Sequence, residues 1–109
     1  MVRRLTLVRR AEHLTKEEFV GHWRGTHARL AMTLPGLRGY RLNAVIQNPE
    51  GFEWDGVAEL WFDSPEAAAH AFSVEPLRSQ LAADSSTFLA KAVPFFVEEF
   101  TVIEPPSIS

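Results

Sequence analysis

The chain has 109 residues, of which 46% are hydrophobic and 23% are charged, a composition that allows one compact domain and excludes a disordered or coiled-coil protein. Its 11 Lys and Arg residues stand against 14 Asp and Glu residues, and the net charge of −3 argues against a dedicated binder of nucleic acids or anionic membranes. The absence of cysteine excludes disulfides, a thiolate nucleophile and an Fe–S cluster.

The N-terminal part of the chain predicts a strand followed by a long helix. In residues 2–9, successive side chains alternate between two faces, as in a strand that is covered on both sides. Thr15 and Glu18 have the spacing of a capping box, which indicates a helix N-terminus. We expect this helix to continue to about Leu34, because Pro35-Gly36 cannot extend it.

Two antiparallel strands are predicted next. Residues 36–47 and 54–62 alternate between apolar and polar positions, and Asn48-Pro49-Glu50-Gly51 between them is typical of a turn. Tyr40 and Leu42 share one face of the first of these strands. The register of the sheet decides whether that face points toward the helices.

A second helical region and a last strand complete the predicted elements. Ser64 is suited to a helix N-cap, and Pro65 to the first position inside the helix. In chain order we expect a helix over 64–72, a short helix over 77–83, a segment of helix or loop over 84–92, a strand over 95–103 and a tail over 105–109. Residues 1–104 are therefore predicted to form the single domain.

The order β-α-β-β-α-β predicts a ferredoxin-like α+β fold, in which two helices cover one face of a four-stranded antiparallel sheet. The other face is then left bare. We expect Val8, Val45 and Trp61 to point to that bare face, which is too much apolar surface to leave in water. The sequence therefore predicts a homodimer with its two sheets face to face.

His27 is the main candidate for chemistry. With about 100° of rotation per residue from Phe19, His27 falls at about 80°, within the buried face of the first predicted helix. An imidazole that points inward needs a partner. One interpretation is a core histidine hydrogen-bonded to a backbone carbonyl or to Tyr40, and the other is a general acid or base in an apolar pocket.

A two-histidine metal site on the same helix is not expected. His22 falls at about 300° on the same wheel, which is about 140° from His27. Metal ligands on one helix favour a spacing of three or four residues, whereas these two are five apart. Haem ligation needs only one imidazole, so His27 keeps that alternative open.

Two glycines in this helix also call for an explanation. Gly21 and Gly25 each disfavour the helix by about 1 kcal/mol relative to alanine. They lie on one face, away from the buried one. We expect a loop or a partner chain to approach them closely.

The aromatic residues suggest how a ligand could bind. Tyr40 is the only tyrosine, and its hydroxyl would meet His27 if it lies on the helix side of the sheet. Phe52 and Trp54 are expected to line the rim of a pocket for a flat apolar ligand. The predicted substrate contacts are Trp23, Phe52, Trp54 and Leu60.

Three motifs resemble the EthD domain family over nearly the whole chain. They are Phe19-x-x-His22-Trp23-x-x-x-His27, Leu34-Pro35-Gly36-Leu37-x-x-Tyr40, and Asp55-Gly56-Val57-Ala58-Glu59-Leu60-Trp61-Phe62-Asp63-Ser64. The resemblance implies a dimeric α+β barrel and a role near the degradation of ethers, lactones or polyketide-like aromatic compounds.

The same resemblance implies roles for two residues. Family members that are methylmuconolactone isomerases use a helix histidine and a following tyrosine, which align with His27 and Tyr40. Those isomerases also have a cysteine where this chain has Leu60, and a histidine where it has Phe52-Glu53-Trp54. The motifs are specific to the family and not to this reaction.

Three functions follow as hypotheses. The first is a cofactor-free enzyme, an isomerase, cyclase, dehydratase or oxygenase, in which His27 moves a proton and Tyr40 holds the oxygen of an apolar carbonyl, lactone or aromatic compound. The second is a non-catalytic binding or auxiliary protein with the same pocket, and the third is a haem-binding relative.

We expect no metal, no nucleic acid and no membrane partner. Because no apolar run approaches the roughly 18–20 residues of a membrane span, and residues 1–10 lack a signal-peptide core, we expect a cytoplasmic protein.

Overall fold

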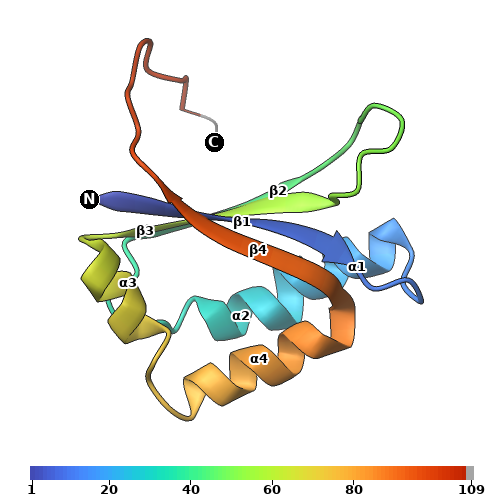
Figure 1. Cartoon of the computed structure of the whole chain (residues 1–109), viewed down its shortest axis with the longest axis horizontal. Coiled ribbons are helices and arrows are strands. Elements are labelled where there is room, and N and C mark those ends of the chain that lie inside the picture. Colours follow the sequence, from blue (N-terminus) through green and yellow to red (C-terminus); the bar gives the residue numbers. More distant parts are fainter. Residues whose placement is uncertain (108–109) are drawn as a thin grey trace.

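The computed structural model describes residues 1–107 and shows a four-stranded antiparallel sheet with helices on one face (Figure 1). The strands are ordered β2-β3-β1-β4, which confirms the predicted ferredoxin-like α+β fold. In chain order the elements are β1 (Val2–Arg10), α1 (Lys16–His22), the π-helix η1 (Trp23–His27), α2 (Ala28–Ala31), β2 (Gly39–Ala44), β3 (Gly56–Phe62), α3 (Pro65–Ala71), α4 (Leu77–Phe88) and β4 (Leu89–Val97). The sheet of the single chain is open and does not close into a barrel.

Both predicted helix starts are confirmed. The Thr15 hydroxyl accepts a hydrogen bond from the Glu18 amide at 3.1 Å, and the Glu18 carboxylate accepts one from the Thr15 amide at 2.9 Å. The Ser64 hydroxyl caps α3 by accepting from the Ala67 amide at 3.0 Å. Such caps satisfy amides that have no partner within the helix.

The last strand differs from its predicted range of 95–103. α4 continues through Phe88, and β4 begins directly at Leu89. β4 pairs with β1 until Val97 lies opposite Arg3. The strand ends there because β1 itself starts at Val2 and offers nothing further to pair with, so residues 98–103 lie outside the sheet.

The strand register decides which side chains face the helices. Val8 is 2% exposed and lies on the helix side, so the expectation that it points to the bare face was wrong. Because side chains alternate along a strand, Leu5 and Leu7 of β1 project from the other face of the sheet, where Leu7 pairs with Val57 of β3. The bare face therefore does carry apolar side chains, supplied by odd-numbered residues: Leu5, Leu7, Val57, Trp61, Val93 and Phe95.

The core lies between the sheet and the helices. Its most completely buried large side chains are Trp23, Phe19, Phe62 and Phe88. Gly56 of β3 makes room for the Trp23 indole, because a Cβ atom at Gly56 would lie 2.5 Å from Trp23 Cη2. No helix within residues 1–107 has the length and apolar character needed to cross a membrane.

No loop within residues 1–107 approaches Gly21 or Gly25 closely, so that part of the expectation was wrong, whereas approach by a partner chain stays a prediction. A Cβ atom at Gly21 would meet nothing within 4 Å. One at Gly25 would meet only the Arg29 guanidinium, at 3.8 Å. Both glycines line an open groove together with Ala44 and Ile46.

Candidate active site

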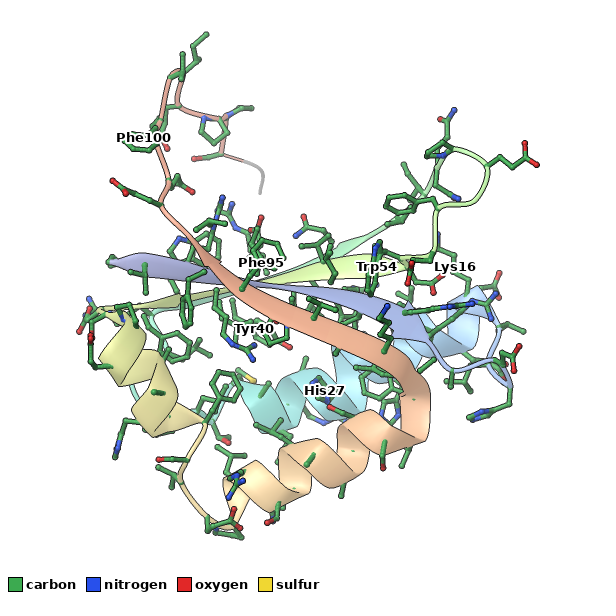
Figure 2. All side chains as sticks on the ribbon, viewed as in Figure 1. Lys16, His27, Tyr40, Trp54, Phe95 and Phe100 are labelled. Atoms are coloured by element: carbon green, nitrogen blue, oxygen red, sulfur yellow. The ribbon has the colours of Figure 1, made fainter. Side chains whose placement is uncertain are left out.

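A cavity of about 280 Å³ lies between the sheet and the helices. Its wall is mainly apolar, with contributions from all four strands and from η1, α2 and α4. Figure 2 shows Tyr40 and His27 in this space, Tyr40 on the side of the sheet and His27 on the side of the helices. The polar residues in the wall are Arg4, Thr6, His27, Tyr40, Arg78 and Ser85.

Asp84 joins two histidines at the helical wall of this cavity. Its carboxylate accepts from His27 Nδ1 at 2.8 Å, and from His22 Nε2 at 2.9 Å. The side chains of His27 and Asp84 are each 14% exposed, whereas that of His22 is 29% exposed. The pair of bonds fixes both imidazole rings in the same small region.

The bond to Asp84 determines the tautomer of His27. A carboxylate can only accept, so Nδ1 of His27 carries a proton. In the neutral ring Nε2 is then an acceptor, and it has no hydrogen-bond partner within residues 1–107. His27 is a lining residue of the cavity, and its Nε2 is the ring nitrogen left without a hydrogen-bond partner in the described chain. Neither a backbone carbonyl nor Tyr40 is its partner in the described chain, which corrects that interpretation of a core histidine.

The π-helix explains why two histidines five residues apart meet at one carboxylate. The predicted separation of about 140° assumed a regular α-helix. η1 spans Trp23–His27, and its i→i+5 turns are wider than α-helical turns. Residues five apart therefore lie on one side of the helix, and the separation predicted for His22 and His27 was wrong.

Asp84 is the site residue that the sequence reasoning missed. It lies in α4, where Leu77, Leu81 and Phe88 are buried. Spacings of four, three and four residues place Asp84 on this same face of α4. A carboxylate on an apolar helix face needs a partner, and this signal was hidden because residues 84–92 had no definite prediction.

Phe88 packs against both imidazole rings. Its ring centroid lies 4.6 Å from that of His22 and 4.9 Å from that of His27. Phe88 is 1% exposed and also packs against Phe19, at 6.0 Å. Asp84 and Phe88 are four residues apart on α4, so one helix face both binds and packs the histidines.

Tyr40 lies on the helix side of the sheet, which settles the question that the register left open. It pairs with Leu60 of β3, and both residues line the cavity. Burial raises the pKa of the Tyr40 hydroxyl to about 12. The phenol therefore stays protonated at neutral pH and can donate a hydrogen bond to an oxygen in the cavity.

Titration of Tyr40 gives a direct test of this burial. Because Tyr40 is the only tyrosine, the phenolate absorbance near 295 nm reports this residue alone. We expect a midpoint near pH 12 in the folded protein, against about 10 in the unfolded chain. The folded state then binds the proton more tightly, so the free energy of unfolding falls as the pH rises from about 10 to about 12. A midpoint at the unfolded value, with the circular dichroism still native, would contradict the buried position.

The predicted substrate contacts divide into two groups. Trp23 and Leu60 line the cavity together with His27 and Tyr40. Phe52 and Trp54 are not among its lining residues, so the chain does not bring them to this pocket as expected. The connection between β2 and β3 that carries them rises on the side opposite the helices (Figure 1), and Lys91 covers the Trp54 ring at 5.2 Å.

No group of three or more His, Cys, Asp or Glu side chains in residues 1–107 has the arrangement of a metal site. His22 and His27 direct ring nitrogens to Asp84 rather than to a common point that an ion could occupy. The cluster is therefore interpreted as a hydrogen-bond network.

Comparison with known proteins assigns the family. The family model for the EthD domain matches residues 11–92, a range that includes His22, His27, Tyr40 and Asp84. The chain belongs to the EthD domain family. The resemblance found in the sequence motifs is thereby confirmed. None of the functionally curated proteins matches this EthD domain chain.

Solved structures support the same fold. An EthD family protein from Bacillus halodurans C-125 has a TM-score of 0.74 and 24% identity, over 92% of this chain and 100% of that one. A dimeric ferredoxin-like protein of unknown function from Thermobifida fusca has a TM-score of 0.68 and 20% identity, over 88% of each chain. A hydroxynitrile lyase from Passiflora edulis has a TM-score of 0.72 and 13% identity, over 94% and 96%. At these identities the similarity concerns the fold.

Proposed function

We propose that this EthD domain protein is a cofactor-independent enzyme that moves a proton on an apolar carbonyl, lactone or aromatic compound. The observation that carries the proposal is the hydrogen bond from Nδ1 of His27, a lining residue of the apolar cavity, to Asp84; this bond leaves Nε2 as the acceptor nitrogen of the ring. A histidine oriented by a carboxylate is the usual arrangement of a general base.

The proposed chemistry begins at His27. Its Nε2 takes a proton from a carbon next to the carbonyl; the electron pair of the broken C–H bond forms a C=C bond, and the π pair of the carbonyl moves onto its oxygen. The imidazolium that forms is stabilised by the Asp84 carboxylate. Return of the proton to a different carbon completes an isomerisation, and return to a departing oxygen completes an elimination.

Tyr40 is proposed to hold the oxygen on which charge develops. A tyrosine hydroxyl is protonated at neutral pH at its ordinary pKa of about 10, and burial, which raises the pKa of Tyr40 to about 12, extends this to higher pH. A donor in an apolar cavity stabilises a developing oxyanion more strongly than water does, because the local dielectric constant is low. The two residues thus lie on opposite walls, one to move the proton and one to hold the oxygen.

The working assembly is proposed to be a homodimer with sheet facing sheet. The bare face carries Trp61 and Val57, and Val93 and Phe95 are 36% and 39% exposed there. The β2–β3 connection and the C-terminal segment rise on this same side (Figure 1). A second copy would cover this apolar surface and close a barrel.

Replacing His27 by alanine tests the proposed function. Wild type, His27→Ala and the exposed control His70→Ala are incubated with a panel of lactones and aromatic ketones, and consumption is followed by mass spectrometry. We expect His27→Ala to lose about 10²–10⁴-fold in rate, as for a missing general base, and His70→Ala to match wild type.

Native mass spectra of the same samples check that every variant keeps the proposed dimer. Equal consumption by His27→Ala would contradict the role of the histidine. Compounds that bind to wild type without ever being consumed would support the non-catalytic binding protein instead.

A further inference from the structure

The cavity carries positive charge at the end away from the histidines. Arg4 of β1 and Arg78 of α4 both line it, and among residues 1–107 no Asp or Glu lines it. This contrasts with the chain as a whole, which has a net charge of −3. A cavity lined by one sign of charge attracts ligands of the opposite sign.

Arg4 is held in position without an acidic partner. Its guanidinium donates to the Thr6 hydroxyl at 2.9 Å and lies over the Phe72 ring, 4.2 Å from the centroid. Within residues 1–107 it makes no ion pair, and Thr6 is its one hydrogen-bond partner. Burial lowers the pKa of this group, because a charge in an apolar region has lost its hydration.

Other arginines of the same strand are placed differently. Arg3 pairs with Glu99 at 2.7 Å, and Arg10 lies 3.5 Å from Asp55. Arg4 therefore has a cost of desolvation that no carboxylate of the described chain offsets. Buried charges in proteins are usually paired, so a ligand with a negative charge would supply the partner that the described chain does not.

The sheet places Arg4 close to the proposed chemistry. Arg4 pairs with Leu60 of β3, and Leu60 pairs with Tyr40 of β2, so all three side chains project from one row on the helix side. Two strand spacings separate the backbones of Arg4 and Tyr40, a distance of about 10 Å. Val8, which also lines the cavity, lies on β1 four residues from Arg4, a distance of roughly 13 Å along the strand.

We infer that the cavity takes a substrate bearing a carboxylate, and that Arg4 binds this carboxylate at the Phe72 end while the carbonyl group lies between Tyr40 and His27. The inference rests on the proposed function of this same site and specifies its substrate class: cyclic or aromatic carbonyl compounds with one acidic group. The guanidinium fork suits a carboxylate, because two parallel N–H groups can bind its two oxygens. Arg4 is then a binding residue, and the proton transfer remains with His27.

Binding of a matched pair of probes tests the inference without any need for turnover. The pair is 2-naphthoate and 2-naphthamide, which differ in charge but little in shape, measured by calorimetry on wild type and on Arg4→Gln. Arg9→Gln is the matched control, because Arg9 lies on the same strand, is exposed and does not line the cavity.

We expect wild type to prefer the naphthoate by about 10–100-fold, as for a charge-assisted hydrogen bond. Arg4→Gln should lose this preference, with little change for the naphthamide, and Arg9→Gln should retain it. Arg4→Lys keeps the charge but loses the fork, so an intermediate preference is expected. If Arg4→Gln does not fold, the inference is tested by two other results: the preference of wild type for naphthoate over naphthamide, and the reduction of this preference in Arg4→Lys.

Equal binding of the two probes to wild type would overturn the inference, as would failure of both to bind or an equal loss in Arg9→Gln. A naphthoate preference in a protein that consumes no compound would leave the inference standing and remove the proposed function. Consumption of carboxylate-bearing compounds at an undiminished rate by Arg4→Gln would overturn the inference and leave the proposed function standing.

Discussion

Replacing Asp84 by asparagine is expected to reduce turnover by about 10²–10⁴-fold, because the wrong tautomer of a general base cannot accept a proton. The Asp84 carboxylate accepts from both His22 and His27, whereas an asparagine side chain has one acceptor oxygen and a donating amide. An amide that donates to Nδ1 of His27 would move the ring proton to Nε2. The nitrogen at the cavity would then donate instead of accepting.

The tautomer can be measured independently of activity. Long-range ¹H–¹⁵N spectra of the histidine rings should show Nδ1 of His27 protonated in wild type and Nε2 protonated in Asp84→Asn. Asp84→Glu, which keeps a carboxylate, should recover part of the rate. The control is Asp63→Asn, since the Asp63 side chain is 66% exposed and pairs with Arg38 on the surface. An unchanged tautomer combined with an unchanged rate would contradict the positioning role of Asp84.

Placing a methyl group at Gly56 is expected to destabilise the fold by about 1–3 kcal/mol, the usual cost of overfilling a packed core. The new Cβ atom would lie 2.5 Å from Trp23 Cη2 and 3.0 Å from the Asn43 carbonyl oxygen. Trp23 is 2% exposed, and its ring is stacked on Phe19 at 5.1 Å, so the indole has little room to move. In a domain of this size each 1 kcal/mol lowers the Tm by roughly 4–8 °C.

A double-mutant cycle identifies the contact responsible. Trp23→Phe removes the outer atoms of the indole, so Gly56→Ala should cost less in that background than in wild type. Gly21→Ala is the control, because a Cβ atom there meets nothing within 4 Å and should stabilise the helix by about 0.5–1 kcal/mol. Thermal unfolding of the four proteins measures the coupling. Additive effects would show that the indole is not what excludes a Cβ atom from Gly56.

The strands and helix starts could largely be predicted because their signals are local. Thr15 and Ser64 mark helix N-termini through hydrogen bonds to amides only three residues away. Alternation in the strands depends on neighbouring residues, and it placed Tyr40 and Leu42 on one face. The end of β4 is different, because it depends on where β1 begins, and this explains the wrong range for the last strand.

The two histidines illustrate what a regular helical period cannot predict. The position of His27 on the buried face followed from a spacing of four residues, from Phe19 through Trp23. The π-helix that brings His22 to the same side departs from the regular 3.6-residue period on which the sequence-based expectation was built. The expectation of two separated histidines failed for this reason.

The sequence by itself determined the fold class, the family and the histidine on the inner face, because periodicity, caps and motifs are properties of short segments. Only the tertiary structure decided that Asp84 binds both histidines, that Val8 faces the helices and that Arg4 lines the same cavity as Tyr40. These facts depend on strand register and on contacts between residues as far apart as His22 and Asp84. Such distant contacts form when the whole chain minimises exposed apolar surface and unpaired polar groups, and no local pattern contains that information.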